Sequence, residues 1–430
     1  MKNIAIAQAT EYVGKTVTLK GWAYNFRSSG KIFFLQLRDG TGVIQAVVSR
    51  GDVSEESFAA CEQITMESSV SVEGVIREDS RSPSGVEMQA SAIKLIQRAD
   101  EYPIAKKEHG IEFLLDHRHL WIRSSRQTAI LRIRDQIVWS MRSFLREQGY
   151  LLTDTPILTP TACEGTTTLF ETDYFDTKAY LAQSGQLYLE ALAAALGRVY
   201  DFGPTFRAEK SKTRRHLMEF WMLDAEAAFM EHPESMDVQE KLIHRVVQDV
   251  LKNQKRELEV LERDVEALQK ISQPFPRITY DEAIDVLRKS GSDIKRGDDL
   301  GADDETILSK QYSSPLFVTK FPTAIKAFYM KPDPENAERV LCADMLAPEG
   351  YGEIIGGSQR IDDLALLEKR FKEHDLSLEA FGWYRDLRKY GSFPHSGFGV
   401  GLERVVTWIC GLDHVREAIP FPRLLNRITP

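Results

Sequence analysis

The first hundred residues alternate between apolar and polar positions in short runs, with a period of two. A single helix-like segment, about 54–66, interrupts them, and glycine-containing turns such as RSSG and DGTG separate the others. The strand-like runs are 17–26, 31–39, 42–49, 69–76 and 86–96. Five short strands with one helix predict a small closed barrel of the OB type. The topology alone leaves open a generic β-domain without a binding role.

The period changes to 3.6 after a polar, charged segment at 99–123. A first long helix is expected over 126–149 and a second helical region over about 237–270. The rest mixes strands and helices without a regular βαβ alternation, which favours an antiparallel sheet with flanking helices. We therefore expect an α+β chain: a barrel domain over 1–100, a hinge over 101–125 and a larger domain over 126–430.

Composition narrows the class of protein. The 430 residues are 43% hydrophobic and 28% charged, with a formal net charge of -9, which argues against bulk nucleic-acid binding but allows a local basic patch. No apolar run approaches the roughly 18 residues of a membrane span, and the N-terminus has no signal-peptide pattern. The four cysteines form neither a CxxC pair nor a Cys/His cluster. We expect a cytoplasmic protein without disulfides or structural zinc.

The stretch FRAEKSKTRRHLMEF places a cation and a carboxylate two residues apart, so Arg207 and Glu209 project from the same face of a strand. A guanidinium there suits a phosphate, and a carboxylate suits an amino group such as that of adenine. The run 210–215 forms a mobile basic tip suited to a polyanion, and Phe220 is placed to stack beneath a base. A surface hairpin with salt bridges is the simpler alternative.

Two later stretches carry further candidates. In HSGFGVGLER, three alternate glycines leave one face of a strand bare for a flat ligand, and Arg404 follows where a helix begins. No βαβ unit follows and no strand lysine is suitably placed, which excludes dinucleotide folds and kinases. In LCADMLAPEGYGEIIGG, Asp344 and Glu353 bracket a glycine-rich turn and are candidate Mg²⁺ ligands, or else surface acids.

The order of these stretches resembles the three signature motifs of class II aminoacyl-tRNA synthetases: the long helix with Pro156, then FRAE…RHLMEF, then GFGVGLER. The barrel and the hinge DHRHLWIR are similar to the aspartate/asparagine/lysine subgroup. Within it, the longer stretches resemble bacterial asparaginyl-tRNA synthetases over essentially the full chain. They are TPTACEGTTTLF, YLAQSGQLYLEA, APEGYGEIIGGS and IPFPRLLNR.

This resemblance implies a ligase that activates asparagine with ATP and transfers it to the 3′ end of tRNA(Asn). It implies that Arg207 binds the α-phosphate, that Glu209 contacts the adenine amino group, and that Phe220 and Arg404 sandwich the adenine. It also implies that His216 lies near the triphosphate and that the 210–215 loop meets the acceptor end of the tRNA. The metal ligands it implies for Mg²⁺ are Asp344 and Glu353.

For the amino acid, the resemblance implies one set of residues for the ammonium group and another for the side chain. The ammonium set is Glu164, Ser184 and Gln186. Arg360 is implied at the side-chain carbonyl. Aspartyl enzymes carry a lysine where this chain has Leu189, which disfavours aspartate, whereas Asp224 replaces the glutamate common in asparaginyl enzymes and resembles aspartyl ones.

The resemblance further implies an anticodon-binding barrel that uses Arg27, Phe34 and Gln45, although Phe34 alone would equally suit the barrel core. It implies a homodimer formed through the 126–149 helix, a surface helix within one subunit being the alternative. The open alternatives for function are an aspartyl or non-discriminating synthetase, a tRNA-independent paralogue and a non-enzymatic RNA-binding descendant. The selectivity, the reader of the third anticodon base, the number of metal ions and the role of 237–270 stay open.

Overall fold

The structure is a computed structural model that describes residues 1–82, 84–105, 107–160, 169–211 and 213–430. The chain divides into two compact units, Met1–Gly110 and Ile111–Pro430.

The N-terminal unit is a closed barrel, as its alternating pattern predicts. Its strands are β1 (Lys2–Asn3), β2 (Thr16–Ser29), β3 (Ile32–Arg38), β4 (Val43–Ser49), β5 (Ser69–Glu78) and β6 (Val86–Gln97). They follow the order β1-β2-β3-β4-β6-β5, and β2 also pairs with β5, which closes the barrel. The helix expected near 54–66 is α1 (Glu55–Glu62), which begins after Ser54, whose side chain accepts a hydrogen bond from the backbone of Ser57. The OB-type expectation is confirmed.

Strand β3 shows why the barrel could be predicted. Its side chains alternate between buried and partly exposed positions along the whole strand. Phe33 is buried and stacks on Phe26 with ring centroids 5.6 Å apart, whereas Phe34 faces outward. The two phenylalanines therefore point to opposite faces of the strand, and Phe34 does not belong to the barrel core.

The segment expected as a hinge contains two short helices, α2 (Ile111–Asp116) and α3 (Arg118–Trp121), and both belong to the second unit. Arg118 is buried and donates hydrogen bonds to the carbonyl oxygens of Ile419 and Pro420, each at 2.8 Å. The end of the segment is thus anchored to residues about three hundred positions later in the chain.

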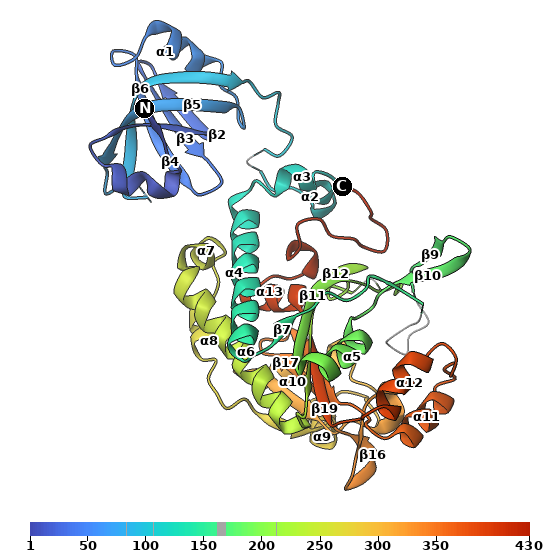
Figure 1. The fold of residues 1–430 in the computed structure, drawn as a ribbon. Coiled ribbons are helices and arrows are strands. Elements are labelled where there is room, and N and C mark those ends of the chain that lie inside the picture. Colours follow the sequence, from blue (N-terminus) through green and yellow to red (C-terminus); the bar gives the residue numbers. More distant parts are fainter. Residues whose placement is uncertain (83, 106, 161–168, 212) are drawn as a thin grey trace. The chain divides into compact units, whose positions relative to one another are not determined.

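The second unit carries the long helices that the 3.6-residue period predicts (Figure 1). The helix expected over 126–149 is α4 (Ser125–Glu147). The helical region expected over 237–270 contains three helices, because the chain breaks at Gln254 and again near Glu262, which adopts a positive φ. These helices are α6 (His232–Asn253), α7 (Lys255–Val260) and α8 (Val265–Gln269). The others are α5 (Gln186–Leu196), α9 (Tyr280–Lys289), α10 (Ala302–Ser309), α11 (Leu364–Glu373), α12 (Gly382–Lys389) and α13 (Leu402–Cys410).

An eight-stranded sheet forms the centre of this unit, in the order β13-β14-β17-β18-β19-β12-β11-β7. Its strands are β7 (Leu151–Leu152), β11 (Arg198–Phe206), β12 (Glu219–Ala228), β13 (Arg277–Thr279), β14 (Leu316–Thr319), β17 (Cys342–Ala347), β18 (Gly352–Gln359) and β19 (His395–Gly401). The six central strands are antiparallel, as expected, and the two edge pairings, β13 with β14 and β11 with β7, are parallel. Outside it lie the hairpin β9 (Glu171–Tyr174) and β10 (Thr177–Leu181), which also pairs with β8 (Leu158–Thr159), and the pair β15 (Pro332–Asp333) and β16 (Asn336–Val340).

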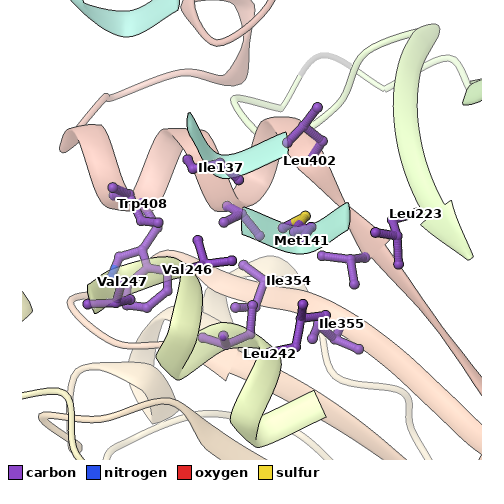
Figure 2. Packing of buried hydrophobic residues seen from close by; sticks show 14 of the residues in the cluster. Ile137, Met141, Leu223, Leu242, Val246, Val247, Ile354, Ile355, Leu402 and Trp408 are labelled. Carbon is purple, nitrogen blue, oxygen red and sulfur yellow. The ribbon is translucent and has the colours of Figure 1, made fainter. Parts of the chain in front are cut away.

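The two faces of the sheet have opposite character because side chains alternate along each strand. On β12, Leu223 and Ala225 point into the main hydrophobic core, and the residues between them point to the other face. Figure 2 shows the apolar face packed against α4, α6 and α13, with side chains from each element directed toward one another. The labelled residues are Ile137, Met141, Leu223, Leu242, Val246, Val247, Ile354, Ile355, Leu402 and Trp408. The other face is thus left for polar chemistry.

In the part of the chain that the structure describes, we find no helix with the length and hydropathy needed to cross a membrane. Cys61, Cys342 and Cys410 are buried and form no disulfide. Cys163 lies outside the described residues.

Candidate active site

The polar face of the sheet contains a cavity of about 490 Å³ in the second unit. Most of the candidate site residues line it. They are Ser184, Gln186, Arg207, His216, Phe220, Asp224, Asp344, Glu353, Arg360 and Arg404. The sequence motifs, which lie up to 220 positions apart, therefore converge on one site.

Arg207, which directly follows β11, lies beside Phe220 on β12. The guanidinium of Arg207 lies 5.3 Å from the ring centroid of Phe220. Its Nε is buried and has no hydrogen-bond partner among the described residues. A buried, unpartnered guanidinium nitrogen at a cavity wall is a site for an anion.

Glu209 does not line the cavity; its carboxylate lies 3.7 Å from Nε2 of His216, which does. Burial and the nearby charge of Arg404 lower the pKa of His216, so its imidazole is neutral at neutral pH. This part of the site thus offers a neutral ring next to a carboxylate.

The basic loop differs from its expectation at one end. The side chain of Arg215 is only 9% exposed and donates a hydrogen bond to Glu305 on α10 at 2.8 Å and to the carbonyl oxygen of Gly350 at 2.8 Å. The expectation of a mobile basic tip is therefore wrong for Arg215, because its guanidinium pairs with Glu305 in another element. Lys212 lies outside the described residues.

Arg404, at the start of α13, is paired with Glu353. Its Nη1 lies 2.9 Å from both the backbone oxygen and Oε2 of Glu353. Burial works against the charge of Arg404, but Glu353 and Glu305 outweigh it and the pKa rises. Burial beside Glu353 raises the pKa of Glu305 to about 7. The alternation of charges keeps this wall of the cavity from carrying a large net charge.

The two candidate metal ligands approach a common point above β18. A Cβ placed on Gly356 would lie 3.1 Å from Oε1 of Glu353 and 3.8 Å from Oδ1 of Asp344. Asp344 also contacts Nζ of the buried Lys326 at 2.7 Å. Burial raises the pKa of Asp344 to about 6, with Lys326 opposing the rise. Among the described residues there is no group of three or more His, Cys, Asp or Glu that could hold a metal ion. The two carboxylates offer oxygen ligands of the kind that Mg²⁺ prefers.

The alternate glycines of β19 make room for the side chains of β12. Asp224 is paired with Gly399 and Glu226 with Gly397. A Cβ on Gly399 would lie 2.6 Å from Oδ1 of Asp224, and a Cβ on Gly397 would overlap Oε2 of Glu226. The expectation that the bare strand admits a flat ligand directly needs correction, because carboxylates of the neighbouring strand cover part of it, although Gly399 still borders the cavity.

A second carboxylate pair lies at the end of the cavity near α5. Oδ2 of Asp224 accepts hydrogen bonds from the hydroxyl of Ser184 at 2.8 Å and the backbone nitrogen of Gly185 at 2.9 Å. Asp201 lies opposite Asp224 on β11, and burial together with the charge of Asp224 raises the pKa of Asp201 to about 7. Glu164, the third residue expected near the ammonium group, lies outside the described residues.

Arg360 borders the cavity and is held by Glu226, which the sequence analysis did not single out. Nη2 of Arg360 lies 2.9 Å from Oε2 of Glu226, and Nη1 donates a hydrogen bond to the hydroxyl of Ser358 at 2.7 Å. Leu189, by contrast, packs with Ala193 and Val199 in a small apolar cluster and is not among the residues that line the cavity. The ion pair between Arg360 and Glu226 had no local sequence signal, because the two residues are 134 positions apart in the chain.

The outer face of the barrel brings the three candidate anticodon residues onto adjacent strands. Arg27 and Phe34 are cross-strand partners, and the guanidinium lies 4.4 Å from the ring centroid. Gln45 donates a hydrogen bond to Glu87 at 3.3 Å. The face thus presents an aromatic ring, a cation and an amide.

Comparisons with known proteins agree with this geometry. The family model of class II tRNA synthetases (D, K and N) matches residues 110–425, and the model of an OB-fold nucleic-acid binding domain matches 17–96. The chain is 57% identical, over the whole of both chains, to the asparagine–tRNA ligases of Pelotomaculum thermopropionicum and Symbiobacterium thermophilum. The crystal structure of asparaginyl-tRNA synthetase from Pyrococcus horikoshii complexed with asparaginyl-adenylate superimposes with a TM-score of 0.97, at 46% identity and with full coverage of both chains. The chain therefore belongs to the class II tRNA synthetases of the aspartate, lysine and asparagine group, and within that group to the asparagine–tRNA ligase family.

Proposed function

We propose that the cavity activates asparagine with ATP and passes it to the 3′ end of tRNA(Asn). A carboxylate oxygen of asparagine attacks the α-phosphorus, the bond to pyrophosphate breaks, and a terminal ribose hydroxyl then displaces AMP from the carbonyl carbon. The protein positions the reactants and stabilises the developing charge. The observation that carries the proposal is the convergence on one cavity of Arg207, whose buried Nε has no hydrogen-bond partner among the described residues, with Asp224 and Arg360.

The nucleotide end of the cavity lies around Phe220. We assign adenine stacking to Phe220 and Arg404, the α-phosphate to Arg207, and the adenine amino group to Glu209. The unpartnered Nε of Arg207 supports an anion beside that residue. His216, with its lowered pKa, approaches the triphosphate as a neutral hydrogen-bonding group.

The amino-acid end lies around α5 and Arg360. Ser184 and Gln186 take the ammonium group with Glu164, and Arg360 donates to the side-chain carbonyl. Asp224 borders the same region and repels a substrate carboxylate. Leu189 packs away from the cavity. Its only effect on the choice of substrate is that position 189 offers no cation to pair with a substrate carboxylate.

The test is pyrophosphate exchange with asparagine and with aspartate, followed by charging of tRNA(Asn). We expect exchange and charging with asparagine, and a much lower kcat/KM with aspartate. Faster exchange with aspartate would support an aspartyl or non-discriminating enzyme instead. Exchange without charging would support the tRNA-independent paralogue, which the OB-fold match at 17–96 argues against.

We propose that Mg²⁺ bound by Asp344 and Glu353 neutralises the phosphates of ATP during exchange. The convergence of the two carboxylates at Gly356 supports this proposal. Asp344→Asn is expected to raise severalfold the Mg²⁺ concentration that gives half-maximal exchange. The control is Asp362→Asn, which disrupts a Lys–Asp pair away from the cavity and leaves that concentration unchanged. An equal Mg²⁺ requirement in both variants would argue against Asp344 as a ligand.

We further propose a homodimer that works in the cytoplasm. Apolar side chains exposed on α4 and on the edge strand β7 support an interface: Trp139 is 62% exposed and Leu151 52%. An apolar, unpaired sheet edge is normally covered by another chain. Sedimentation equilibrium should give twice the mass of 48.9 kDa, and a monomer at micromolar concentration would contradict the dimer. Fractionation of cells that produce the protein tests the compartment.

A further inference from the structure

A group of buried charged side chains lies behind the amino-acid end of the cavity, and Glu190 is its centre. Glu190, on α5, is 1% exposed. Its carboxylate accepts hydrogen bonds from side chains of three elements. The donors are Gln186 at 3.1 Å, Tyr384 at 2.8 Å, Arg388 at 2.7 Å and His395 at 3.0 Å. Neither the family resemblance nor the proposed substrate contacts assign this residue a function.

Glu190 fixes the orientation of Gln186, which lines the cavity. The two residues are four positions apart on α5 and therefore lie on the same face of the helix. A carboxylate repels an amide oxygen, so the NH₂ group of Gln186 must face Glu190. The amide oxygen is then the atom of Gln186 that remains for a donor in the cavity, such as a substrate ammonium group.

Glu190 also compensates buried positive charge near Arg360. Arg388 contacts Glu190 at 2.7 Å, as Arg360 contacts Glu226 at 2.9 Å. Burial opposes the charge of Glu190, but Arg388 and His395 outweigh it and the pKa falls, so Glu190 is ionised at neutral pH. Each guanidinium thus has its own carboxylate. A further buried charge without a partner of opposite sign would cost free energy here.

His395 does not shift the balance of positive and negative charges in favour of an acidic substrate. Its Nε2 faces Glu190 at 3.0 Å and its Nδ1 faces the carbonyl oxygen of Phe393 at 2.8 Å, so both ring nitrogens already lie against acceptors. Arg360 and Arg388 already face Glu226 and Glu190, and Asp224 adds a carboxylate at the same end of the cavity. A substrate carboxylate would find no surplus cation, whereas a neutral amide needs none.

We propose that Glu190 is a positioning residue that sets the choice of substrate side chain: it turns the acceptor of Gln186 toward the substrate ammonium and supplies the negative charge that disfavours aspartate relative to asparagine. The proposal rests on the proposed activation of asparagine. A purely structural Glu190, which only ties α5 to α12 and β19, would affect both amino acids equally.

The experiment compares Glu190→Gln with Tyr384→Phe in pyrophosphate exchange. The first substitution removes the charge and keeps the shape; the second removes one hydrogen bond to the same carboxylate and leaves the charge in place. For Glu190→Gln we expect the ratio of kcat/KM for aspartate to that for asparagine to rise about tenfold, through a lower KM for aspartate and a higher KM for asparagine. For Tyr384→Phe we expect a ratio within about twofold of the wild type. An unchanged ratio in Glu190→Gln, or equal changes in both variants, would overturn the proposal.

A second variant changes the charge in the opposite direction. Arg388→Gln leaves Glu190 in place and removes a cation, so the aspartate-to-asparagine ratio should fall below that of the wild type; a rise would overturn the proposal. This variant decides the question if Glu190→Gln does not fold, as judged by circular dichroism. Wild-type protein that fails to exchange with asparagine would reject the proposed function itself, whereas normal wild-type exchange with an unaltered ratio in the variants rejects only the inference on Glu190.

Discussion

The ion pair between Arg134 and Glu403 allows a test of how the proposed nucleotide site is held together. Nη1 of Arg134, on α4, lies 2.8 Å from Oε1 of Glu403 and donates a hydrogen bond to the carbonyl oxygen of Ala418 at 3.1 Å. Oε2 of Glu403 accepts a hydrogen bond from the backbone nitrogen of Trp221 at 3.0 Å. Glu403 thus links α13, which carries Arg404, to β12.

We predict that Arg134→Met costs about 3–5 kcal/mol of unfolding free energy, the usual loss when one partner of a buried pair is removed. The side chains of Arg134 and Glu403 are only 12% and 3% exposed. Burial already raises the pKa of Glu403, and loss of its cation raises the pKa further. A carboxylate whose folded pKa is raised contributes stability below its unfolded pKa and loses it as pH rises. The loss of unfolding free energy in Arg134→Met, relative to the wild type, should therefore be largest at neutral pH and shrink toward pH 4.

The control is Arg132→Met on the same helix. Arg132 pairs with Glu257 at 3.0 Å, but its side chain is 37% exposed, so the pair contributes only about 0–1 kcal/mol. Urea unfolding of both variants, followed by tryptophan fluorescence, gives the two losses in stability. We also expect Arg134→Met to raise the KM for ATP, because Glu403 is bonded to the backbone next to Phe220 and precedes Arg404 in the chain. Equal losses of stability in the two variants would refute the role of the buried pair.

Three further predictions address other parts of the molecule. Phe34→Ala should weaken tRNA charging about tenfold and leave pyrophosphate exchange intact, since base stacking on one ring is worth about 1–3 kcal/mol; equal loss in both assays would make Phe34 a packing residue. Asp201→Asn should reduce the loss of stability between pH 4 and pH 7, because the folded pKa of about 7 lies above the unfolded value and the protonated form stabilises the fold; urea unfolding across that range measures it, and parallel profiles would contradict it. Gly399→Ala should lower kcat/KM for asparagine, because its Cβ would lie 2.6 Å from a carboxylate oxygen of β12, whereas Gly382→Ala meets no atom within 4 Å and should behave as the wild type.

The sequence predicted those parts of the fold that depend on local periodicity. The barrel strands and α4 follow from periods of two and 3.6 because each element buries one face, and Phe33 and Phe34 take opposite sides for that reason. The break of the 237–270 region into three helices was not predicted. The spacing of the buried Val250 and Leu258 also suits one continuous helix, and the positive φ of Glu262 has no glycine or proline to mark it.

The candidate site was predicted in its motif residues but not in the groups that hold them. Arg207, Phe220 and Arg404 belong to recognisable stretches and do meet at one cavity. Glu190 and Glu403 lie in quoted stretches too, but their ion pairs had no signal, because the cationic partners come from other elements; Arg388, for example, is 198 positions away from Glu190. A buried ion pair is specified by the assembled fold, and a single sequence shows only two ordinary charged residues.

The alternation of side chains on the central sheet explains why the motifs have their spacing. On β12 and β19 the odd and even positions divide between the apolar core and the cavity, so Asp224 and Glu226 share a face with Gly397 and Gly399. A shift of one residue in the pairing of β12 with β19 would turn both carboxylates into the core and the apolar residues into the site. The glycines therefore do more than open space, because only they allow the carboxylates of β12 to lie over β19 in this register. The same register holds Asp224, at the proposed ammonium end, on a rigid sheet, and the proposed attack on the α-phosphorus requires such fixed positions.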